Sequence, residues 1–376
     1  MRHCIFHIPM AVDPSAVSGS SNRPHRMIAA FRAIGYEVDV VMGVANDRRK
    51  QIQQIKQRIR EGRSYDFAYC ESSTMPTALT EPHHLPSHPF LDFQFMRFCK
   101  RHGIPIGLFY RDAYWRYRPY RDSVGLVRSL VARFFYLTDL FQYRGILTIL
   151  YVPTLRFAED AIRHSKLLTL SRTLPPGAPT SSSIQQRAHD KFADAPPPQH
   201  LQLLYVGGVG HQYDIGALLS ALDRLPMCEL TVCCRKPEWD QFVAESPLLA
   251  QHPRLRVVHL SGEELEPLYD VAHICLLFLR PQAYLHNAMP IKLMEYLGHC
   301  VPVIEVDGSS GAEFVKEHQT GWAIPYSEDS FVNLLVRLHT DFGLIRTAYA
   351  NCQQALSSNT WEARARQVAN DLGVRQ

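Results

Sequence analysis

Short apolar runs alternate with longer stretches of helical periodicity along the first half of the chain. In the helical stretches, apolar residues recur every three or four positions, whereas the short runs have the length of buried strands. This alternation predicts parallel strands joined by crossover helices. The predicted strands are Cys4–Ile8, Glu37–Met42, Asp66–Cys70, Pro105–Phe109, Ile146–Val152 and Lys166–Leu170. The predicted helices lie near Arg23–Ile34, Asp47–Glu61, Leu91–His102, Val124–Gln142 and Leu155–His164.

The same pattern begins again after two segments rich in proline and small polar residues, near 174–183 and 195–198. Such segments indicate turns and linkers. We therefore expect an α/β protein with a first Rossmann-like domain at 1–178, a linker at 179–200, a second Rossmann-like domain at 201–356 and a terminal helix at 357–376. The predicted strands of the second half are Leu201–Val206, Leu230–Cys234, Leu255–His259, Ile274–Leu279, Val301–Val306 and Gly321–Ile324.

Composition narrows the class of protein without naming a function. The chain has 376 residues, of which 46% are hydrophobic and 20% charged, and this is ordinary for globular domains. The net charge of +4 is too small to indicate nucleic-acid binding by itself. Nine cysteines without a C-x-x-C pair indicate buried thiols in a reducing compartment. We expect a cytoplasmic protein, because the sequence shows neither a signal-peptide pattern nor an apolar run of membrane-spanning length.

The segment from Asn287 to Ile304 contains the clearest candidates for ligand-binding residues. Pro290 suits a helix start, and Lys292 and Glu295 lie three residues apart on one helix face. The amide groups at a helix start bind anions, a lysine neutralises a phosphate, and a carboxylate accepts hydrogen bonds from a ribose diol. Together these groups could bind a nucleotide diphosphate. The three-residue spacing of Lys292 and Glu295 alone is equally typical of a surface Lys–Glu pair.

This segment resembles the donor-site signature of family 4-like glycosyltransferases, also called glycosyl transferases group 1, of the bacterial surface-polysaccharide type. Glu295 matches the second Glu of the family signature, and Val301-Pro-Val-Ile matches its tail. Asn287 replaces the first Glu, and Cys300 stands where Gly is usual. The resemblance implies a GT-B fold, in which two Rossmann-like domains face a cleft and a terminal helix returns to the first domain. It also implies that Glu295 binds the ribose of a UDP or GDP sugar and that Asn287 contacts the sugar.

A glycine turn opens the second domain. Gly207, Gly208 and Val209 follow a predicted strand, and their backbone could approach a phosphate or simply form a tight turn. The resemblance implies that this turn faces the donor diphosphate. The family often has an Arg and a Lys just after the turn, and here both are missing. Charge for the diphosphate would then come from Lys292, with Arg235 as a further candidate.

An aromatic and basic segment follows the strand at Pro105–Phe109 in the first domain. Residues 110–121 hold four arginines, four tyrosines and Trp115. The segment could bind an acceptor, contact a membrane, form a solvated loop or bind nucleic acid, and we favour acceptor or membrane contact. In the next predicted helix, Leu126, Val127, Leu130, Val131, Phe134, Leu137 and Phe141 share one face. That face could pack in the core or enter a membrane interface, so 110–142 is the candidate membrane-contacting region.

The remaining site candidates lie in the first domain. Asp112 stands where many family members have an Asp after a His, and it is the candidate base or acceptor-positioning group beside Arg111. Glu71 follows a predicted strand, and Ser20 and Arg23 lie between the first strand and first helix. An Asp paired with a neighbouring arginine for structural reasons is the alternative for Asp112. No Asp-x-Asp motif occurs, and we expect no metal ion and no cofactor.

Together these features predict a glycosyltransferase that moves a sugar from a nucleotide diphosphate to a lipid-linked saccharide or surface polysaccharide. The resemblance implies retention of anomeric configuration, and Lys292 would stabilise the leaving diphosphate. Peripheral attachment to the cytoplasmic face of the membrane is a separate hypothesis, and nucleic acid is not expected as a partner. Two alternatives stay open, namely a nucleotide-sugar epimerase of the same fold and a non-catalytic binding or scaffold protein.

Overall fold

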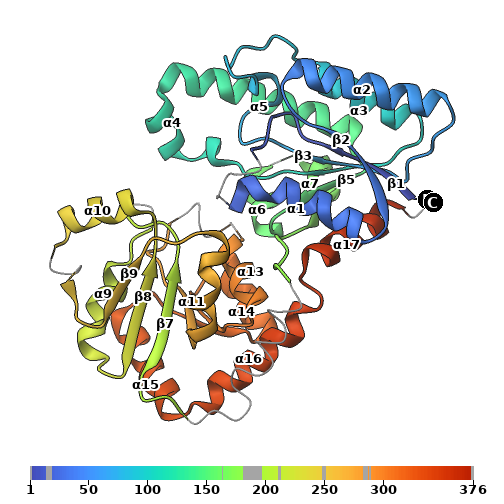
Figure 1. Cartoon of the computed structure of the whole chain (residues 1–376). Helices are drawn as coiled ribbons and strands as arrows, with labels where there is room; N and C mark the ends of the chain where they lie inside the picture. The colour runs from blue at the N-terminus through green and yellow to red at the C-terminus, as the bar shows by residue number, and fades with distance from the viewer. Residues whose placement is uncertain are drawn as a thin grey trace. The chain divides into compact units, whose positions relative to one another are not determined.

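The chain folds into two compact units (Figure 1). The computed structural model describes residues 2–13, 19–162, 164–180, 197–210, 213–247, 251–282, 287 and 289–373, and the side chains of 19–21 are not described. Unit 1 comprises Met1–Pro176 and Trp361–Gln376, and unit 2 comprises Gly177–Thr360. The chain thus passes between the units twice, next to Pro176 and next to Thr360. Most of the predicted linker at 179–200 lies outside the described residues.

Unit 1 is built on a parallel six-stranded sheet. Its strand order is β2-β1-β3-β4-β5-β6. The strands are β1 (Arg2–His7), β2 (Tyr36–Val41), β3 (Phe67–Glu71), β4 (Ile106–Phe109), β5 (Ile149–Val152) and β6 (Ser171–Thr173). The helices are α1 (Gly19–Ala33), α2 (Ala45–Arg60), α3 (Leu91–Arg101), α4 (Arg118–Val124), α5 (Leu126–Ile146), α6 (Leu155–Ala161), α7 (Ser165–Thr169) and α17 (Trp361–Gly373).

Two apolar clusters cover the two faces of this sheet. Alternate residues of a strand point to opposite faces, and β1 accordingly sends Ile5 to one cluster and Cys4 and Phe6 to the other. The first cluster is completed by α2, α3 and α5, and the second by α1 and α17. Both sides of β1 are therefore buried, as expected for a parallel sheet between helices.

Unit 2 has its own parallel six-stranded sheet and its own core. The strand order is β12-β11-β10-β7-β8-β9. The strands are β7 (Leu201–Val206), β8 (Cys228–Cys233), β9 (Leu255–Val258), β10 (Ile274–Leu277), β11 (Val303–Val306) and β12 (Gly321–Ile324). The helices are α9 (Gly216–Ala221), α10 (Lys236–Glu245), α11 (Glu266–Val271), α13 (Ile291–Gly298), α14 (Ser310–His318), α15 (Glu328–Thr340) and α16 (Gly343–Leu356).

Strand order fixes where ligands are expected. In unit 2 the chain moves from β7 to β8 on one side, whereas β10 pairs with β7 on the other. In unit 1, β1 likewise lies between β2 and β3. Ligands of such sheets bind beyond the carboxyl ends of the strands at the point where the order reverses. Ligand-binding residues are therefore expected just after β7 and β10 in unit 2 and just after β1 and β3 in unit 1.

The predicted strand at Lys166–Leu170 is wrong. Residues Ser165–Thr169 form α7, and the strand of this region is β6, at the edge of the sheet. A short apolar run cannot distinguish one buried helical turn from a strand. Leu167 packs into the core from α7, while the edge strand has the polar sequence Ser-Arg-Thr.

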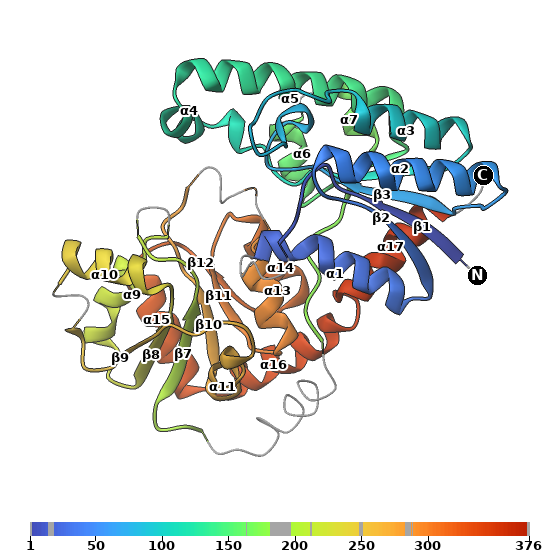
Figure 2. The same cartoon turned by 45° about the horizontal axis from the view of Figure 1, so that its top comes forward.

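The C-terminal helix belongs to unit 1, as the family resemblance implied. Helix α17 contacts α1 and the sheet, and Figures 1 and 2 both show the two helices side by side. Trp361, Ala365, Val368 and Leu372 enter the same cluster as Phe6 and Phe31. The last helix of the chain therefore completes the core of the first unit.

Candidate functional site

The glycine turn after β7 is shaped by close packing. The Tyr205 hydroxyl donates a hydrogen bond of 2.6 Å to the carbonyl oxygen of Gly208. A Cβ atom on Gly207 would lie 2.7 Å from this hydroxyl, and one on Gly208 would lie 2.9 Å from the ring of Tyr213. A side chain at either position would collide with Tyr205 or Tyr213, so this packing requires glycine at both.

Glu238 links the turn to the start of α10. Its carboxylate accepts a hydrogen bond from the Val209 amide at 3.4 Å and forms an ion pair with Arg235. Arg235 precedes α10, and its side chain is largely exposed. The predicted donor residues Val209 and Arg235 are thus connected through the Glu238 carboxylate, to which the sequence pattern assigned no role.

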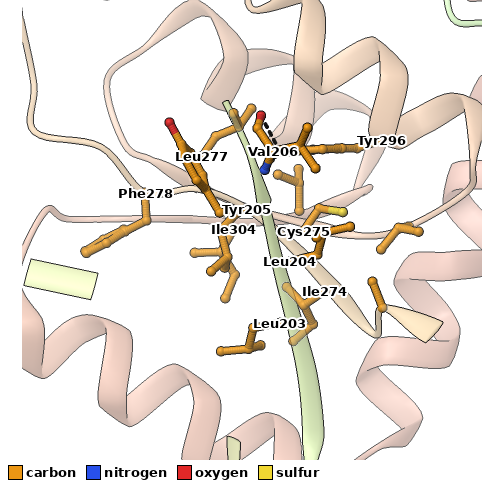
Figure 3. Packing of buried hydrophobic residues seen from close by; sticks show 14 of the residues in the cluster. Leu203, Leu204, Tyr205, Val206, Ile274, Cys275, Leu277, Phe278, Tyr296 and Ile304 are labelled. Carbon is orange, nitrogen blue, oxygen red and sulfur yellow. Dashed lines mark hydrogen bonds between the residues drawn. The ribbon is translucent and has the colours of Figure 1, made fainter. Parts of the chain in front are cut away.

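Helix α13 is anchored to the end of β7. The Tyr296 hydroxyl accepts a hydrogen bond from the Val206 amide at 3.0 Å and lies 3.3 Å from the Val206 carbonyl oxygen, to which it donates (Figure 3). Tyr296 is fully buried among residues of β7, β10 and β11, which include Leu204, Cys275 and Ile304. Because Val206 directly precedes Gly207, this contact holds α13 beside the glycine turn.

The start of α13 carries the predicted lysine and glutamate. The Lys292 ammonium lies 2.5 Å from a carboxylate oxygen of Glu295, and both side chains are partly exposed. The first turn contains no acidic residue, although the helix dipole favours acids and disfavours cations there. Pro290 is the residue just before the helix, and Asn287 is helical and partly buried. The first turn of α13 thus presents a positive charge where most helices place a negative one.

The end of α13 is closely packed. Gly298 is the last helical residue, and a Cβ atom there would lie 2.5 Å from the Pro179 carbonyl oxygen. The left-handed backbone belongs instead to Cys300, with φ of 55°. Gly298 is therefore required for close packing, and Cys300 occupies the left-handed conformation in which glycine is usual.

A buried ionic cluster lies at the carboxyl end of the unit 1 sheet. Glu71, the last residue of β3, has no exposed side-chain surface and contacts Arg23 at 3.3 Å and Arg111 at 2.9 Å. The Tyr69 hydroxyl also donates to Glu71 at 3.1 Å, and the Arg23 guanidinium lies 3.5 Å from the centre of the Phe109 ring. The structure thus brings three of the predicted acceptor-site residues together, with Arg23 and Glu71 as a buried pair. The side chain of Ser20 lies outside the described residues.

Asp112 follows this cluster and is partly buried. One of its carboxylate oxygens accepts a hydrogen bond of 2.9 Å from the Tyr114 amide, whereas Arg111 donates to Glu71. Burial raises the pKa of Asp112, against the opposing effects of the Tyr114 amide and the Arg111 charge. A raised pKa makes a carboxylate a stronger base.

Trp115 is part of the core. Its ring is 5% exposed, stacks on Tyr136 at a centroid distance of 4.9 Å, and donates a hydrogen bond to the Tyr110 hydroxyl. The predicted contact of this ring with an acceptor or lipid headgroup is not supported, because the ring faces α5.

The apolar face predicted on α5 points to solvent. Helix α5 packs on unit 1 through its other face, which carries Ala132, Tyr136, Leu140 and Tyr143. The exposed face includes Val127, at 74%, and Phe134, at 65%. Its members, all large and at least 48% exposed, are Leu126, Val127, Leu130, Val131, Phe134, Leu137 and Phe141. We call these seven residues the α5 stripe, and Figure 2 shows the helix that carries it.

Neither a membrane-spanning helix nor a metal-binding cluster is present in the described part of the chain. No described helix is long and apolar enough to cross a membrane. Among described side chains, no group of three or more His, Cys, Asp and Glu residues is placed to hold a metal ion. All nine cysteines are buried free thiols.

Comparisons with known proteins agree with this architecture. Residues 200–341 match the family model described as glycosyl transferases group 1. HepE from Anabaena, solved in complex with UDP, has a TM-score of 0.64 at 11% identity, with 100% of both chains covered. Sucrose-phosphate synthase from Thermosynechococcus elongatus has a TM-score of 0.61 at 15% identity, with 98% of both chains covered.

A further similar structure is WaaG, a glycosyltransferase involved in lipopolysaccharide biosynthesis. Its TM-score is 0.59 at 16% identity, with 99% of this chain and 100% of WaaG covered. No curated protein has a sequence that matches this chain. The predicted fold is confirmed: the chain has the GT-B fold of these glycosyltransferases, and its second unit carries a glycosyl transferases group 1 domain.

Proposed function

We propose that this protein transfers a sugar from a nucleotide diphosphate, UDP or GDP, to a lipid-linked saccharide or surface polysaccharide. The observation that supports the donor site is the anchoring of α13 by Tyr296 to Val206, the residue before the glycine turn, because Lys292 and Glu295 lie on the same helix. This place is the reversal point of the strand order in unit 2. The UDP complexes of HepE, a protein of the same fold, favour UDP as the nucleotide.

In this proposal the Lys292–Glu295 pair separates when the donor binds. Lys292 and the first amides of α13 hold the diphosphate and stabilise it as the leaving group, while Glu295 accepts hydrogen bonds from the ribose. Asn287 contacts the sugar, and the backbone of Gly207, Gly208 and Val209 lies against the phosphates. Arg235 adds charge if its ion pair with Glu238 opens. Transfer proceeds with retention and without a metal ion.

In this proposal the acceptor is bound by residues of unit 1. Asp112, with its raised pKa, positions or deprotonates the acceptor hydroxyl. Arg111 lies next to it, and the Arg23–Glu71 pair holds the loop after β4 in place through Glu71. Trp115 supports this loop from the core side.

Lys292→Ala tests the donor site. We expect kcat/KM for transfer from a UDP sugar to fall at least about a hundredfold, because a charge that stabilises the leaving diphosphate is removed. Thermal unfolding should stay unchanged, since the lysine is partly exposed. Lys316→Ala is the control, because Lys316 is another ion-paired lysine on a helix of the same unit. Unchanged transfer by Lys292→Ala would contradict the proposal, and release of epimerised sugar without an acceptor would favour an epimerase.

We also propose that the α5 stripe binds the surface of an anionic membrane. Seven large apolar side chains on one face of a long helix form a patch that single exposed apolar residues do not explain. Exposed arginines flank the stripe, with Arg118 and Arg121 on α4 and Arg128 and Arg133 on α5. Apolar side chains between arginines suit a helix lying at the boundary of anionic headgroups and acyl chains.

Replacing Leu130, Phe134 and Leu137 together by serine tests this surface. We expect the wild-type protein to sediment with anionic phospholipid vesicles and the variant to remain in solution, because each large apolar side chain contributes about 1.5 to 3 kcal/mol when buried. Leu155→Ser is the control, since Leu155 is comparably exposed on α6. The membrane proposal would be contradicted if the wild-type protein did not sediment with vesicles. If the wild type also formed a dimer that the triple variant could not form, the α5 stripe would be a self-association surface.

A further inference from the structure

Glu305 is an acidic residue inside the apolar core of unit 2. It lies on β11, between Leu277 of β10 and Ala323 of β12 in the register of the sheet. The residue is 5% exposed, and its strand neighbours Ile304 and Val306 belong to the apolar cluster. Neither the family signature nor the periodicity of the sequence singled it out. A carboxyl group in such surroundings requires a compensating interaction or a proton.

The Glu305 carboxyl group lies against the first turn of α14. Its Oε1 atom accepts a hydrogen bond of 3.1 Å from the Ser309 hydroxyl, and Ser309 also caps α14 by accepting from the Ala312 amide at 2.9 Å. The Oε2 atom is buried and has no hydrogen-bond partner among the described residues. One half of the carboxyl group is therefore bound to the helix cap, and the other half faces the residues beyond it.

The Oε2 atom points toward Gly311 and the start of α13. A Cβ atom on Gly311 would lie 2.9 Å from Oε2 and 3.3 Å from Cδ of Pro290, the residue just before α13. Glu305, Gly311 and Pro290 are thus close neighbours. The carboxyl group occupies the space where the first turns of α13 and α14 approach each other, and only glycine fits between them.

Burial favours the protonated form of the carboxyl group. Burial raises the pKa of Glu305 to about 8, and only the hydrogen bonds from Ser309 and from the Val306 amide oppose this effect. The charged groups nearest the starts of the adjoining helices are Lys292 and Glu295, which pair with each other, and Glu313 in the first turn of α14. Asp307, after β11, pairs with Lys316. None of these charges contributes to the raised pKa.

We propose that Glu305 is a positioning residue of the donor site: its neutral carboxyl group holds the first turns of α13 and α14 together, and its ionisation weakens donor binding. The inference rests on the proposed donor site at α13. An ionised Glu305 would set a negative charge next to the helix start that binds the diphosphate, and it would draw water between the two turns. Donor affinity should therefore be full below the pKa of Glu305 and fall as pH rises through it.

Calorimetric titration of the full chain with UDP, from about pH 6.5 to about pH 9.5, tests this coupling. We expect the affinity of the wild-type protein to fall roughly tenfold across this range, equivalent to one pKa unit of difference between the free and bound states. In Glu305→Gln, which keeps the shape but cannot ionise, that fall should disappear. Titration of UDP itself contributes equally to both proteins, so the difference between them is the readout.

Ser309→Ala provides a second variant if Glu305→Gln folds poorly. Removing the Ser309 hydrogen bond raises the pKa of Glu305 further, so the loss of affinity should begin at a higher pH than in the wild type. An identical pH dependence in the wild type, Glu305→Gln and Ser309→Ala overturns the inference and leaves the donor site standing. Absence of UDP and GDP binding at every pH overturns the donor site and this inference with it.

Discussion

At the scale of single residues, Asp92 is the centre of a polar network inside unit 1. Its carboxylate accepts hydrogen bonds from His7 at 2.8 Å and from Arg48 at 3.0 Å, and all three side chains are at most 2% exposed. Arg48 also donates to the Gly43 carbonyl oxygen at 2.6 Å. Burial alone would raise the pKa of Asp92, but the hydrogen bond from His7 and the charge of Arg48 outweigh burial and lower it. The network fastens β1, α2 and α3 to each other.

Asp92→Asn should therefore destabilise the protein by about 3 to 5 kcal/mol, because the buried Arg48 charge loses its closest carboxylate and keeps the more distant contact with Glu81, at 3.5 Å. A lowered pKa means that the stabilisation is present above the ordinary aspartate pKa and is lost as pH falls below about 4, and the variant should lack this loss. Urea unfolding at neutral and acidic pH measures both effects. Asp122→Asn is the control, since Asp122 is an exposed partner of Arg118 and should change stability by less than about 1 kcal/mol. Equal effects of the two substitutions would argue against the network.

At the scale of elements, periodicity predicts most strands and helices but not which neighbour covers each face. Helix α5 shows this best, because apolar residues lie on both of its faces and the sequence could not choose between them. The structure buries the face with Ala132, Tyr136 and Leu140, since Tyr136 stacks on Trp115 and donates to the Thr74 carbonyl oxygen at 2.5 Å. The choice depends on partners distant in the chain.

The distance in sequence between contacting residues also explains which site residues could be predicted from the sequence. Lys292, Glu295 and the glycine turn could be proposed from the sequence because their chemistry is local to one turn or one helix face. Tyr296 was missed as a site residue because its partner, Val206, lies 90 positions away. Glu305 was missed because a single acidic residue in an otherwise apolar strand does not show its partners, and only the fold sets it against Gly311 and Pro290.

At the scale of the whole molecule, the chain builds two compact units, and unit 2 lies in the sequence between two segments of unit 1. Unit 1 is complete only when α17, made after all of unit 2, contributes Trp361, Ala365 and Leu372 to the cluster around Phe6. Unit 2 contains the entire proposed donor site within Gly177–Thr360. A destabilising substitution in α17 should therefore lower the stability of unit 1 and leave the stability of unit 2 unchanged.

Ala365→Asp tests this division, because Ala365 is 0% exposed and an aspartate there would bury an unpaired charge beside α1. We expect the unfolding transition of unit 1 to move to lower temperature by at least about 10 °C, since a buried unpaired charge destabilises by several kcal/mol. The transition of unit 2 and its binding of UDP should stay unchanged. Arg366→Asp, on the exposed side of the same helix, is the matched control. Scanning calorimetry with and without UDP separates the two transitions, because the nucleotide stabilises only the unit that binds it. If Ala365→Asp instead lowered both transitions together and abolished UDP binding, the two units would unfold as one cooperative body, and the C-terminal helix would support the donor site as well as the first core.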